Sequence, residues 1–384
     1  MNKAPSLANK MLVKNNEQAN WRFVFAHYIK RQISPRQTIT ILLFCCVATT
    51  SVMAQSQRQR THKQATYTLR KSFKKFEYKA LGFSISSMNY FGDVAPAPTR
   101  ISTDLGQTRP SYGFSFEHRK GPHYSYRVAF AYGTIRAADA RLLDDVDEAL
   151  ASAQFNDSYY RFRRNVAFKN HIKDLSVTFV FDFIQNNNYY IRRPQVAPYI
   201  FSGISIFHHN PKARIPGKDV HGKPLAGAGK WVELQPIGTE GQHAELLETD
   251  ANYGVKPYKR LQPSIPVGVG MRYKYGSQIN IFCEFTFRYT FTDYLDDVSR
   301  NYVDLGVFDD EVARSLSYRG NDTPIMRRHT YTGRDGKQYA VEAGFGSEHR
   351  SNIRGNKNDK DMLFLFTVGG QYILTSQYRR AKYR

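Results

Sequence analysis

The sequence is poor in cysteine and tryptophan, and it has no long apolar run after residue 54. It contains only three cysteines and two tryptophans in 384 residues. Cys45 and Cys46 lie in the N-terminal segment, which leaves Cys283 without a partner and excludes a disulfide framework in the rest of the chain. No later stretch approaches the roughly 20 apolar residues that a transmembrane helix requires. We therefore expect neither a disulfide-stabilised domain nor a helical membrane protein.

Acidic residues are also scarce. The chain has 33 Asp and Glu against 55 Lys and Arg, and its net charge is +22. Such a charge can indicate nucleic-acid binding, but here the basic residues are scattered and no recognition motif accompanies them. We therefore expect no nucleic acid as a partner.

The N-terminal segment has the features of a secretory signal. A short apolar run, residues 39–47, follows Lys30, Arg31 and Arg36, and small residues ending at Ala54 come after it. We expect cleavage after Ala54, although the two cysteines of the run also allow a lipoprotein anchor. Cleavage removes seven Lys and Arg and one Glu, which lowers the net charge from +22 to +16.

Apolar and polar residues alternate in eight segments after the signal. In the most regular segment, Ile281 and Phe285 lie on one face, whereas Glu284 and Arg288 lie on the other. Charged side chains would be costly in a dry sandwich core, but they suit the polar lumen of a membrane barrel. The pattern predicts an all-β fold, an eight-stranded antiparallel transmembrane outer-membrane β-barrel. Its strands are expected near residues 81–85, 112–118, 124–132, 175–183, 199–207, 265–273, 281–291 and 362–374.

Short and long connections alternate between these segments. The first, third, fifth and seventh connections span roughly 20, 35, 50 and 70 residues, whereas the others are short. Outer-membrane barrels combine short periplasmic turns with long extracellular loops in this way. The predicted organisation is a leader (1–54), a periplasmic segment (55–75), the barrel (76–375) and a basic periplasmic tail (376–384). For an exported barrel, the positive net charge favours contact with anionic lipopolysaccharide or an acidic partner. We expect outer-membrane lipid and lipopolysaccharide as partners.

No motif predicts a metal site or a cofactor. His208 and His209 are adjacent on a strand and point to opposite faces, so they do not form a chelating pair. Asp293, Asp296 and Asp297 lie close together and admit a calcium site, but they lack EF-hand spacing. A turn whose aspartates accept bonds from free backbone amides is the favoured interpretation.

No motif predicts catalysis either. The sequence has no nucleophile elbow and no phosphate-binding loop. A lipid-modifying barrel enzyme would need a serine and a histidine near the outer rim, for which His118, His123 and His171 are candidates. No spacing singles out any of them. We therefore expect no catalytic residues and a protein that is not an enzyme.

Several segments of the sequence stand out together. The most specific of them is the run Thr292 to Ser299, TDYLDDVS. The others are Gly82 with residues 90–93, residues 164–168, residues 198–203 with Phe207 and residues 210–211, and Glu284 with Arg288. Together they resemble one family, the PorG-like (DUF6089-type) outer-membrane barrels of the type IX secretion system, over most of residues 76–375. The residues that the resemblance singles out are Gly92, Asp93, Pro198, Tyr199, Glu284, Arg288, Thr292, Asp293, Tyr294, Asp296 and Asp297.

The resemblance implies a non-enzymatic barrel that anchors a periplasmic ring of PorK/PorN-like proteins beneath the outer membrane. It also implies that residues 293–299 form a rim element that fixes the last long loop. Three alternatives stay open: a passive envelope-stabilising barrel or small pore, a lipid-modifying enzyme, and a secreted soluble barrel. A lumen containing Glu284, Arg288, Arg127 and Arg272 would argue against a wide channel, because eight strands leave room only for side chains.

Overall fold

The computed structural model describes residues 77–94, 108–139, 157–186, 189–322, 328–342, 353–358 and 360–374. All of them belong to one compact unit, residues 71–384. The predicted leader, the segment 55–75 and the basic tail lie outside the described residues. Within the described part, no helix is both long enough and apolar enough to cross a bilayer.

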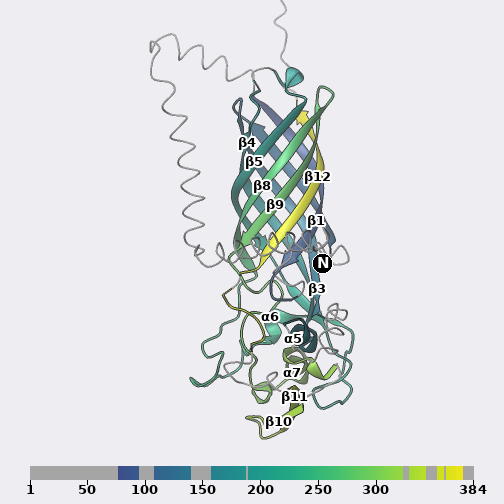
Figure 1. The fold of residues 1–384 in the computed structure, drawn as a ribbon, viewed down its shortest axis with the longest axis vertical. Helices are drawn as coiled ribbons and strands as arrows, with labels where there is room; N and C mark the ends of the chain where they lie inside the picture. The colour runs from purple at the N-terminus through teal and green to yellow at the C-terminus, as the bar shows by residue number, and fades with distance from the viewer. Residues whose placement is uncertain are drawn as a thin grey trace, which may run out of the picture. The chain divides into compact units, whose positions relative to one another are not determined.

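Eight long antiparallel strands form a closed barrel (Figure 1). They pair in the order β3-β2-β1-β12-β9-β8-β5-β4, and pairing of β3 with β4 closes the ring. This confirms the predicted fold. The strands are β1 (Tyr78–Phe91), β2 (Arg109–Arg119), β3 (Tyr124–Ala138), β4 (Ala167–Asp182), β5 (Val196–His208), β8 (Leu261–Tyr275), β9 (Ile279–Thr290) and β12 (Met362–Leu374).

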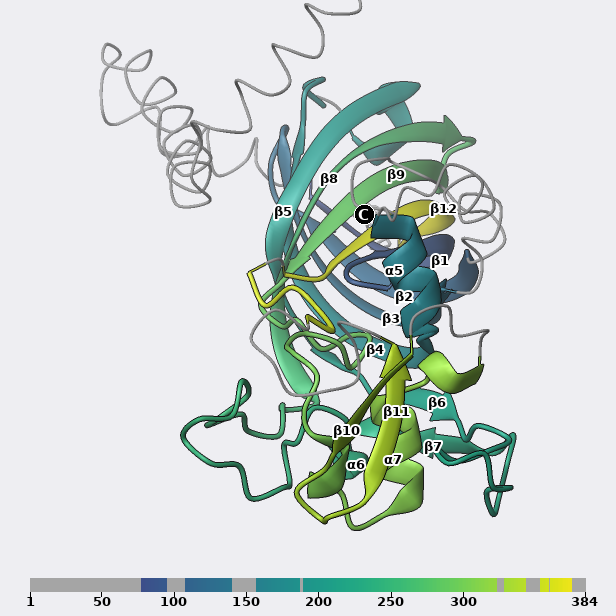
Figure 2. The same cartoon turned by 60° about the horizontal axis from the view of Figure 1, so that its bottom comes forward.

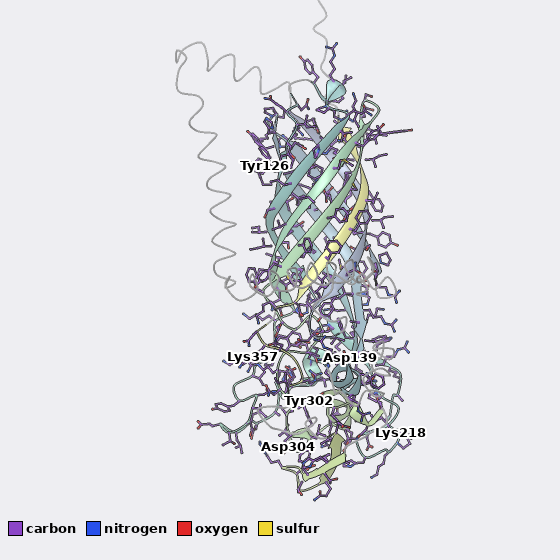
Figure 3. The ribbon with its side chains drawn as sticks, in the orientation of Figure 1. Tyr126, Asp139, Lys218, Tyr302, Asp304 and Lys357 are labelled. Atoms are coloured by element: carbon purple, nitrogen blue, oxygen red, sulfur yellow. The ribbon has the colours of Figure 1, made fainter. Side chains whose placement is uncertain are left out.

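The outer wall of the barrel is apolar and the inner wall is largely polar. Ile204, Phe83 and Phe287 point outward and are 71%, 56% and 56% exposed, whereas Glu117 and Arg127 point inward and are buried. Similar exposed apolar side chains surround the whole barrel, and Figure 3 shows Tyr126 on this wall. A continuous exposed apolar belt around a closed barrel is suited to lipid, not water. The chain is therefore an outer-membrane barrel protein.

The two ends of the barrel carry different connections. Residues 120–123, 183–195 and 276–278 form the short connections, and the middle one contains a 3-10 helix, η2 (Tyr190–Arg192). The long connections leave the opposite end (Figure 1). The predicted alternation is confirmed, and barrels of this class place short turns in the periplasm and long loops outside the cell.

The described parts of the long connections fold into a cap on the extracellular end, which the sequence pattern did not predict. The cap has its own apolar core around Tyr302, Leu305, Tyr318 and Tyr339. Figure 3 shows Tyr302 within the cap. β6 pairs with the extracellular end of β4, and β7 pairs with β6 (Figure 2). The cap elements are α5 (Asp157–Arg164), β6 (Pro211–Arg214), β7 (Trp231–Glu233), α6 (Leu234–Ile237), η3 (Leu305–Val307), α7 (Glu311–Ser317), η4 (Gly320–Asp322), β10 (Arg328–Thr332) and β11 (Gln338–Glu342).

The apolar belt leads to a direct test of lipid exposure. Phe285 lies midway along β9, points outward and is 47% exposed. Phe285→Arg should lower the free energy of unfolding by about 2–4 kcal/mol, because the charge would face the middle of the bilayer. Urea unfolding in lipid vesicles measures this change. Leu247→Arg, at a site that is 58% exposed in the cap, is the matched control, and an equal loss in both variants would contradict a lipid-facing wall.

Candidate functional site

Buried ion pairs fill the lumen of the barrel. Arg127 of β3 contacts Glu284 of β9 at 2.5 Å and Glu117 of β2 at 3.1 Å. The Tyr199 hydroxyl also donates to Glu284, at 2.6 Å, and the Gln371 side-chain amide donates to Glu117, at 2.8 Å. These contacts join strands from opposite sides of the barrel. The interior is therefore bridged by side chains.

A second arginine continues the network toward the periplasmic end. Arg272 of β8 contacts Glu117 at 2.9 Å and Asp182 of β4 at 3.0 Å, and Asp182 also pairs with Arg119. The Arg272 guanidinium lies 4.7 Å from the ring centroid of Tyr199. The positive and negative charges of the lumen balance: its four ion-paired acids are Glu117, Asp174, Asp182 and Glu284, and their arginines are Arg119, Arg127, Arg272 and Arg288.

The periplasmic end of the lumen is closed by the connection between β4 and β5. Arg193 donates to the backbone oxygens of Ser277 and Ile279, both at 2.6 Å, and to the Asn280 side-chain oxygen at 2.7 Å. Tyr190 packs against a small apolar cluster at the ends of β1 and β12. Two short turns are therefore fastened together across the opening.

Removing one member of the lumen network should be costly. Glu284→Ala leaves Arg127 and Tyr199 without their shared acceptor, and breaking a buried pair in this way typically costs about 3–5 kcal/mol. We expect a loss of that order in urea unfolding. Glu77→Ala removes an acid that is 46% exposed and contacts His118 at 2.8 Å, so it should cost under about 1 kcal/mol. Similar losses in the two variants would show that the lumen is hydrated.

The segment 292–299 plugs the extracellular mouth of the barrel. Leu295 and Val298 are fully buried, and the Asn170 side-chain amide of β4 donates to the Leu295 carbonyl at 2.7 Å. The plug joins one apolar cluster with residues of five barrel strands and of two adjoining segments. These partners are Met88, Tyr90, Val94, Ile135, Ala137, Val166, Phe168, Ile172, Phe207, Leu363 and Leu365.

Asp296 lies in a cluster of carboxyl groups beneath the cap. Its Oδ2 accepts from the Tyr90 hydroxyl at 2.5 Å, and its Oδ1 accepts from the Val298 amide at 3.0 Å. The same Tyr90 hydroxyl lies 3.1 Å from Asp361 Oδ1. One hydroxyl hydrogen serves only one acceptor, so a protonated Asp361 that donates to Tyr90 satisfies the second contact. In agreement, burial and the nearby Asp296 raise the pKa of Asp361, and burial and the nearby Asp93 raise the pKa of Asp296.

Gly92 and Asp93 lie beside this cluster. A side chain at Gly92 would collide with the Tyr90 hydroxyl and the Asp361 carboxyl, which explains why a glycine stands there. Asp93 Oδ2 accepts from the Asn356 amide at 2.7 Å. The Asp93 carbonyl accepts from Arg164 of α5 at 2.7 Å. These contacts tie the first long connection to the second and fourth.

The other two aspartates of the segment bond to hydroxyl groups. Asp293 accepts from Ser299 at 2.6 Å, and Asp297 accepts from Thr239 at 2.6 Å and Tyr258 at 2.8 Å. Burial raises the pKa of Asp293 and of Asp297 to about 7. Asp297 has a positive φ of 67°, a conformation that Asp and Asn adopt more readily than other side chains.

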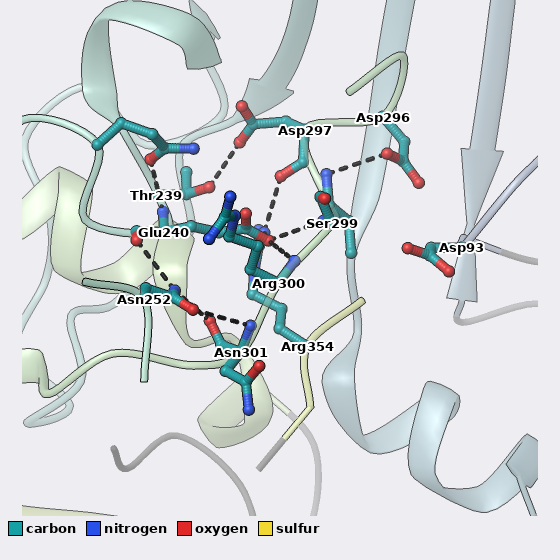
Figure 4. Close-up of polar contacts among 12 residues, drawn as sticks. Asp93, Thr239, Glu240, Asn252, Asp296, Asp297, Ser299, Arg300, Asn301 and Arg354 are labelled. Atoms are coloured by element: carbon teal, nitrogen blue, oxygen red, sulfur yellow. Dashed lines mark hydrogen bonds and ion pairs between the residues drawn. The ribbon is translucent and has the colours of Figure 1, made fainter. Parts of the chain in front are cut away.

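Two charged residues that the sequence did not single out organise the plug from the cap side. Glu240 accepts from the amides of Ser299 and Arg300 at 2.9 and 3.0 Å, and it pairs with Arg354 at 2.9 Å (Figure 4). Arg354 also donates to the Asp297 carbonyl, at 2.8 Å. Both Glu240 and Arg354 are buried although they lie in polar loops. No periodicity marks such positions, which explains why sequence reasoning missed them.

The remaining residues singled out earlier have separate positions. Pro198 is in β5 near the periplasmic end, where its carbonyl accepts from the Phe183 amide at 3.0 Å. Arg288 lies in the lumen toward the extracellular end, where it pairs with Asp174. The Thr292 hydroxyl accepts from the Tyr294 amide at 3.2 Å, and the Tyr294 ring stacks on that of Tyr258 with centroids 4.8 Å apart.

The three aspartates that admitted a calcium site do not converge on one point. The carboxylates of Asp293, Asp296 and Asp297 bond to different hydroxyl and amide groups, and no cluster of three or more His, Cys, Asp or Glu side chains suited to a metal occurs in the described residues. His209 is buried and its ring donates to the Lys259 carbonyl at 3.2 Å. Burial lowers the pKa of His209 to about 4, which keeps the ring neutral.

Comparison with protein families gives one match. Residues 66–221 match the model described as "Domain of unknown function (DUF6089)". The match covers 156 of the 384 residues, so this segment is similar to DUF6089. The predicted resemblance is thereby confirmed for the part of the chain that forms β1 to β6. The plug lies beyond the matched residues, but it packs against β1, β3, β4 and β5, which lie within them.

Solved structures with similar folds are bacterial outer-membrane proteins. Ail of Yersinia pestis, solved with the heparin analogue sucrose octasulfate, has 6% identity and a TM-score of 0.30, with 78% of this chain and 99% of Ail covered. The Neisserial surface protein NspA has 8% identity and a TM-score of 0.29, with 77% of this chain and 96% of NspA covered. A major outer-membrane protein of Thermus thermophilus has 10% identity and a TM-score of 0.31, with 77% of this chain and 99% of that protein covered. The assignment of the barrel depends on the pairing of this chain's own eight strands. No curated protein matches the sequence.

The raised pKa values of Asp293 and Asp297 predict that the stability of the plug depends on pH. In the unfolded chain an aspartate has a pKa near 3.9, below the folded value of about 7 for Asp293 and Asp297. The folded state therefore binds more protons between about pH 4 and pH 7, so plug stability is full below this window and falls as pH rises through it. Hydrogen exchange of residues 293–299, corrected for intrinsic rates, should show more opening at pH 8 than at pH 5.

Asp297→Asn identifies the origin of this pH dependence. Asparagine tolerates the positive φ and does not titrate. In this variant, opening of the plug should therefore increase less steeply with pH than in the unaltered protein. Asp309→Asn changes an exposed carboxylate in the cap and is the control. An unchanged pH profile in Asp297→Asn would mean that Asp297 does not contribute to it.

Proposed function

We propose that the protein is a non-enzymatic scaffold of the outer membrane that serves protein secretion. The observation that carries the proposal is the closed interior: paired charges fill the lumen, the plug seals the outer mouth, and Arg193 fastens the inner one. A barrel filled in this way supplies a rigid membrane anchor with a large external cap. Among the described residues, side chains occupy the lumen and its outer mouth, which favours an anchor over a solute channel.

The positions of the histidines support a non-enzymatic role. His118 contacts Glu77 at 2.8 Å, the His123 ring lies 2.9 Å from the Asp182 carbonyl, and His171 lies 3.1 Å from the hydroxyls of Tyr132 and Thr134. Within the described part of the chain, none of the three has a serine hydroxyl as hydrogen-bond partner. A serine–histidine pair is the minimum that the lipid-modifying alternative requires.

We further propose that the scaffold belongs to a type IX secretion machine and anchors its periplasmic PorK/PorN-like ring. The similarity to DUF6089 and the PorG-like segments support this assignment. The periplasmic end also carries exposed basic side chains, among them Lys79, Lys120 and Arg192. The sequence adds four more in residues 379–384, Arg379, Arg380, Lys382 and Arg384. An acidic ring surface would complement this end.

Charge reversal in the short turns tests the ring proposal. Lys120→Glu with Arg192→Glu should reduce recovery of ring subunits in a detergent pull-down at least tenfold, because it reverses two charges of the proposed contact surface. Lys218→Glu with Lys223→Glu makes the same change on the cap (Lys218 is labelled in Figure 3) and should leave recovery unchanged. If the unaltered protein recovers no ring subunits, and secretion persists in a deletion strain, the proposal fails while the barrel stands.

A further inference from the structure

The outer wall changes character where β4 leaves the apolar belt. Lys169, His171 and Lys173 project outward from the extracellular end of β4. β6, which pairs with this end of β4 (Figure 2), contributes Lys212 and Arg214. We call these five residues the β4–β6 patch. Lys169, Lys173 and Lys212 all lie within electrostatic reach of the His171 ring. The patch therefore concentrates positive charge on one strip of the wall.

The strand register places like charges directly opposite each other in this patch. Lys169 of β4 is opposite Lys212 of β6 on one side and Arg136 of β3 on the other. Like charges in directly opposite positions destabilise a sheet. Within the described chain, Lys212 has Glu233 as a partner at 3.2 Å, but neither Lys169 nor Lys173 has a carboxylate partner. An external anion would remove this repulsion.

Aromatic rings accompany the charges. Trp231 of β7 is 39% exposed, and its ring centroid lies 5.1 Å from the Arg214 guanidinium and 5.8 Å from the Lys169 amine. The Tyr132 and His171 rings stack with centroids 6.1 Å apart. Exposed aromatic rings beside Lys and Arg are typical of the boundary between bilayer core and headgroups.

The position of the patch relative to the belt identifies its ligand. Phe130, Leu175 and Ile206 form a paired row on the outer wall and are 49%, 54% and 55% exposed. Lys173 comes two residues before Leu175 in β4, which places it roughly 6.6 Å along the strand from this row, toward the extracellular end. The patch therefore lies at the height of the extracellular headgroups. A lipid in the outer leaflet reaches it without leaving the membrane.

We infer that the β4–β6 patch binds the phosphate groups of lipopolysaccharide. Lysine and arginine bind phosphate oxygens through charge-assisted hydrogen bonds, and several cations on adjacent strands match a headgroup that carries more than one phosphate. The continuity of the patch with the lipid-facing wall favours a membrane lipid over a soluble anion. The site lies on the outer wall and is independent of the proposed ring contact at the periplasmic end.

A matched pair of variants tests this site. Lys169→Gln, Lys173→Gln and Arg214→Gln together remove three charges and leave the Lys212–Glu233 pair in place. Lys218→Gln, Lys223→Gln and Lys230→Gln remove three exposed charges from the cap. Binding of bisphosphorylated lipid A to the purified protein in detergent is followed by native mass spectrometry. The patch variant should bind at least tenfold more weakly, and the cap variant within twofold of the unaltered protein.

Ligand controls separate lipopolysaccharide from other anions. Dephosphorylated lipid A should bind the unaltered protein at least tenfold more weakly, and inorganic phosphate at equal phosphate concentration should not compete. Trp231 reports the location, because in a Trp21→Phe chain it is the only indole, and its emission should shift on addition of lipid A. A cap variant that weakens binding as much as the patch variant overturns the inference, and so does competition by inorganic phosphate.

Loss of the fold is detected separately. Folded barrels migrate differently from unfolded ones on unheated SDS gels, so a misfolded triple variant is recognised before binding is measured. In that case Lys173→Gln alone, an exposed position on β4, should weaken lipid A binding about threefold. The inference would also be overturned if the folded Lys173→Gln protein bound lipid A as tightly as the unaltered protein and Trp231 emission in the Trp21→Phe protein did not shift on addition of lipid A.

Discussion

The pairing of charges inside a narrow closed barrel is the constraint on which the rest of the structure depends. Eight strands leave space for side chains but not for a water column. Charged groups in such a lumen lose their hydration and are tolerated only when each finds a partner. Four acids and four arginines from five of the eight strands satisfy this condition. The network therefore fixes which strands face one another across the interior.

The plug extends this principle to the mouth of the barrel, where carboxyl groups outnumber their cations. Asp296, Asp361 and Asp93 lie close together, and the single Tyr90 hydroxyl lies between the first two. Protonation of these carboxyl groups removes the charge repulsion between them. In the lumen, arginines offset the charge of the acidic side chains instead. Glu240 and Arg354 connect the plug to the cap through an ion pair and a hydrogen bond to the Asp297 carbonyl. On its other side the plug packs against apolar side chains of the barrel strands.

Much of the barrel was predictable because strand periodicity is local. Every predicted segment falls on an observed barrel strand, with at most one residue beyond its end. The inward position of Glu284 followed from its place between Cys283 and Phe285. The cap was not predictable, because its short elements carry no sustained period. Tyr302 and Tyr339 share a core although they lie far apart in the sequence, and nothing near either residue indicates this. Glu240 was missed for the same reason.

The sequence by itself determined the alternation, the number of strands, the two kinds of connection and the positive charge, since all of these are readable along the chain. Only the tertiary structure decided which charges meet. Arg127 and Glu284 are 157 residues apart, and Tyr90 and Asp296 are 206 apart. Such contacts depend on barrel closure and register, because a shift of one residue would turn each side chain to the opposite face. The clustering of Lys169 with Lys212 on the outer wall arises from the same register.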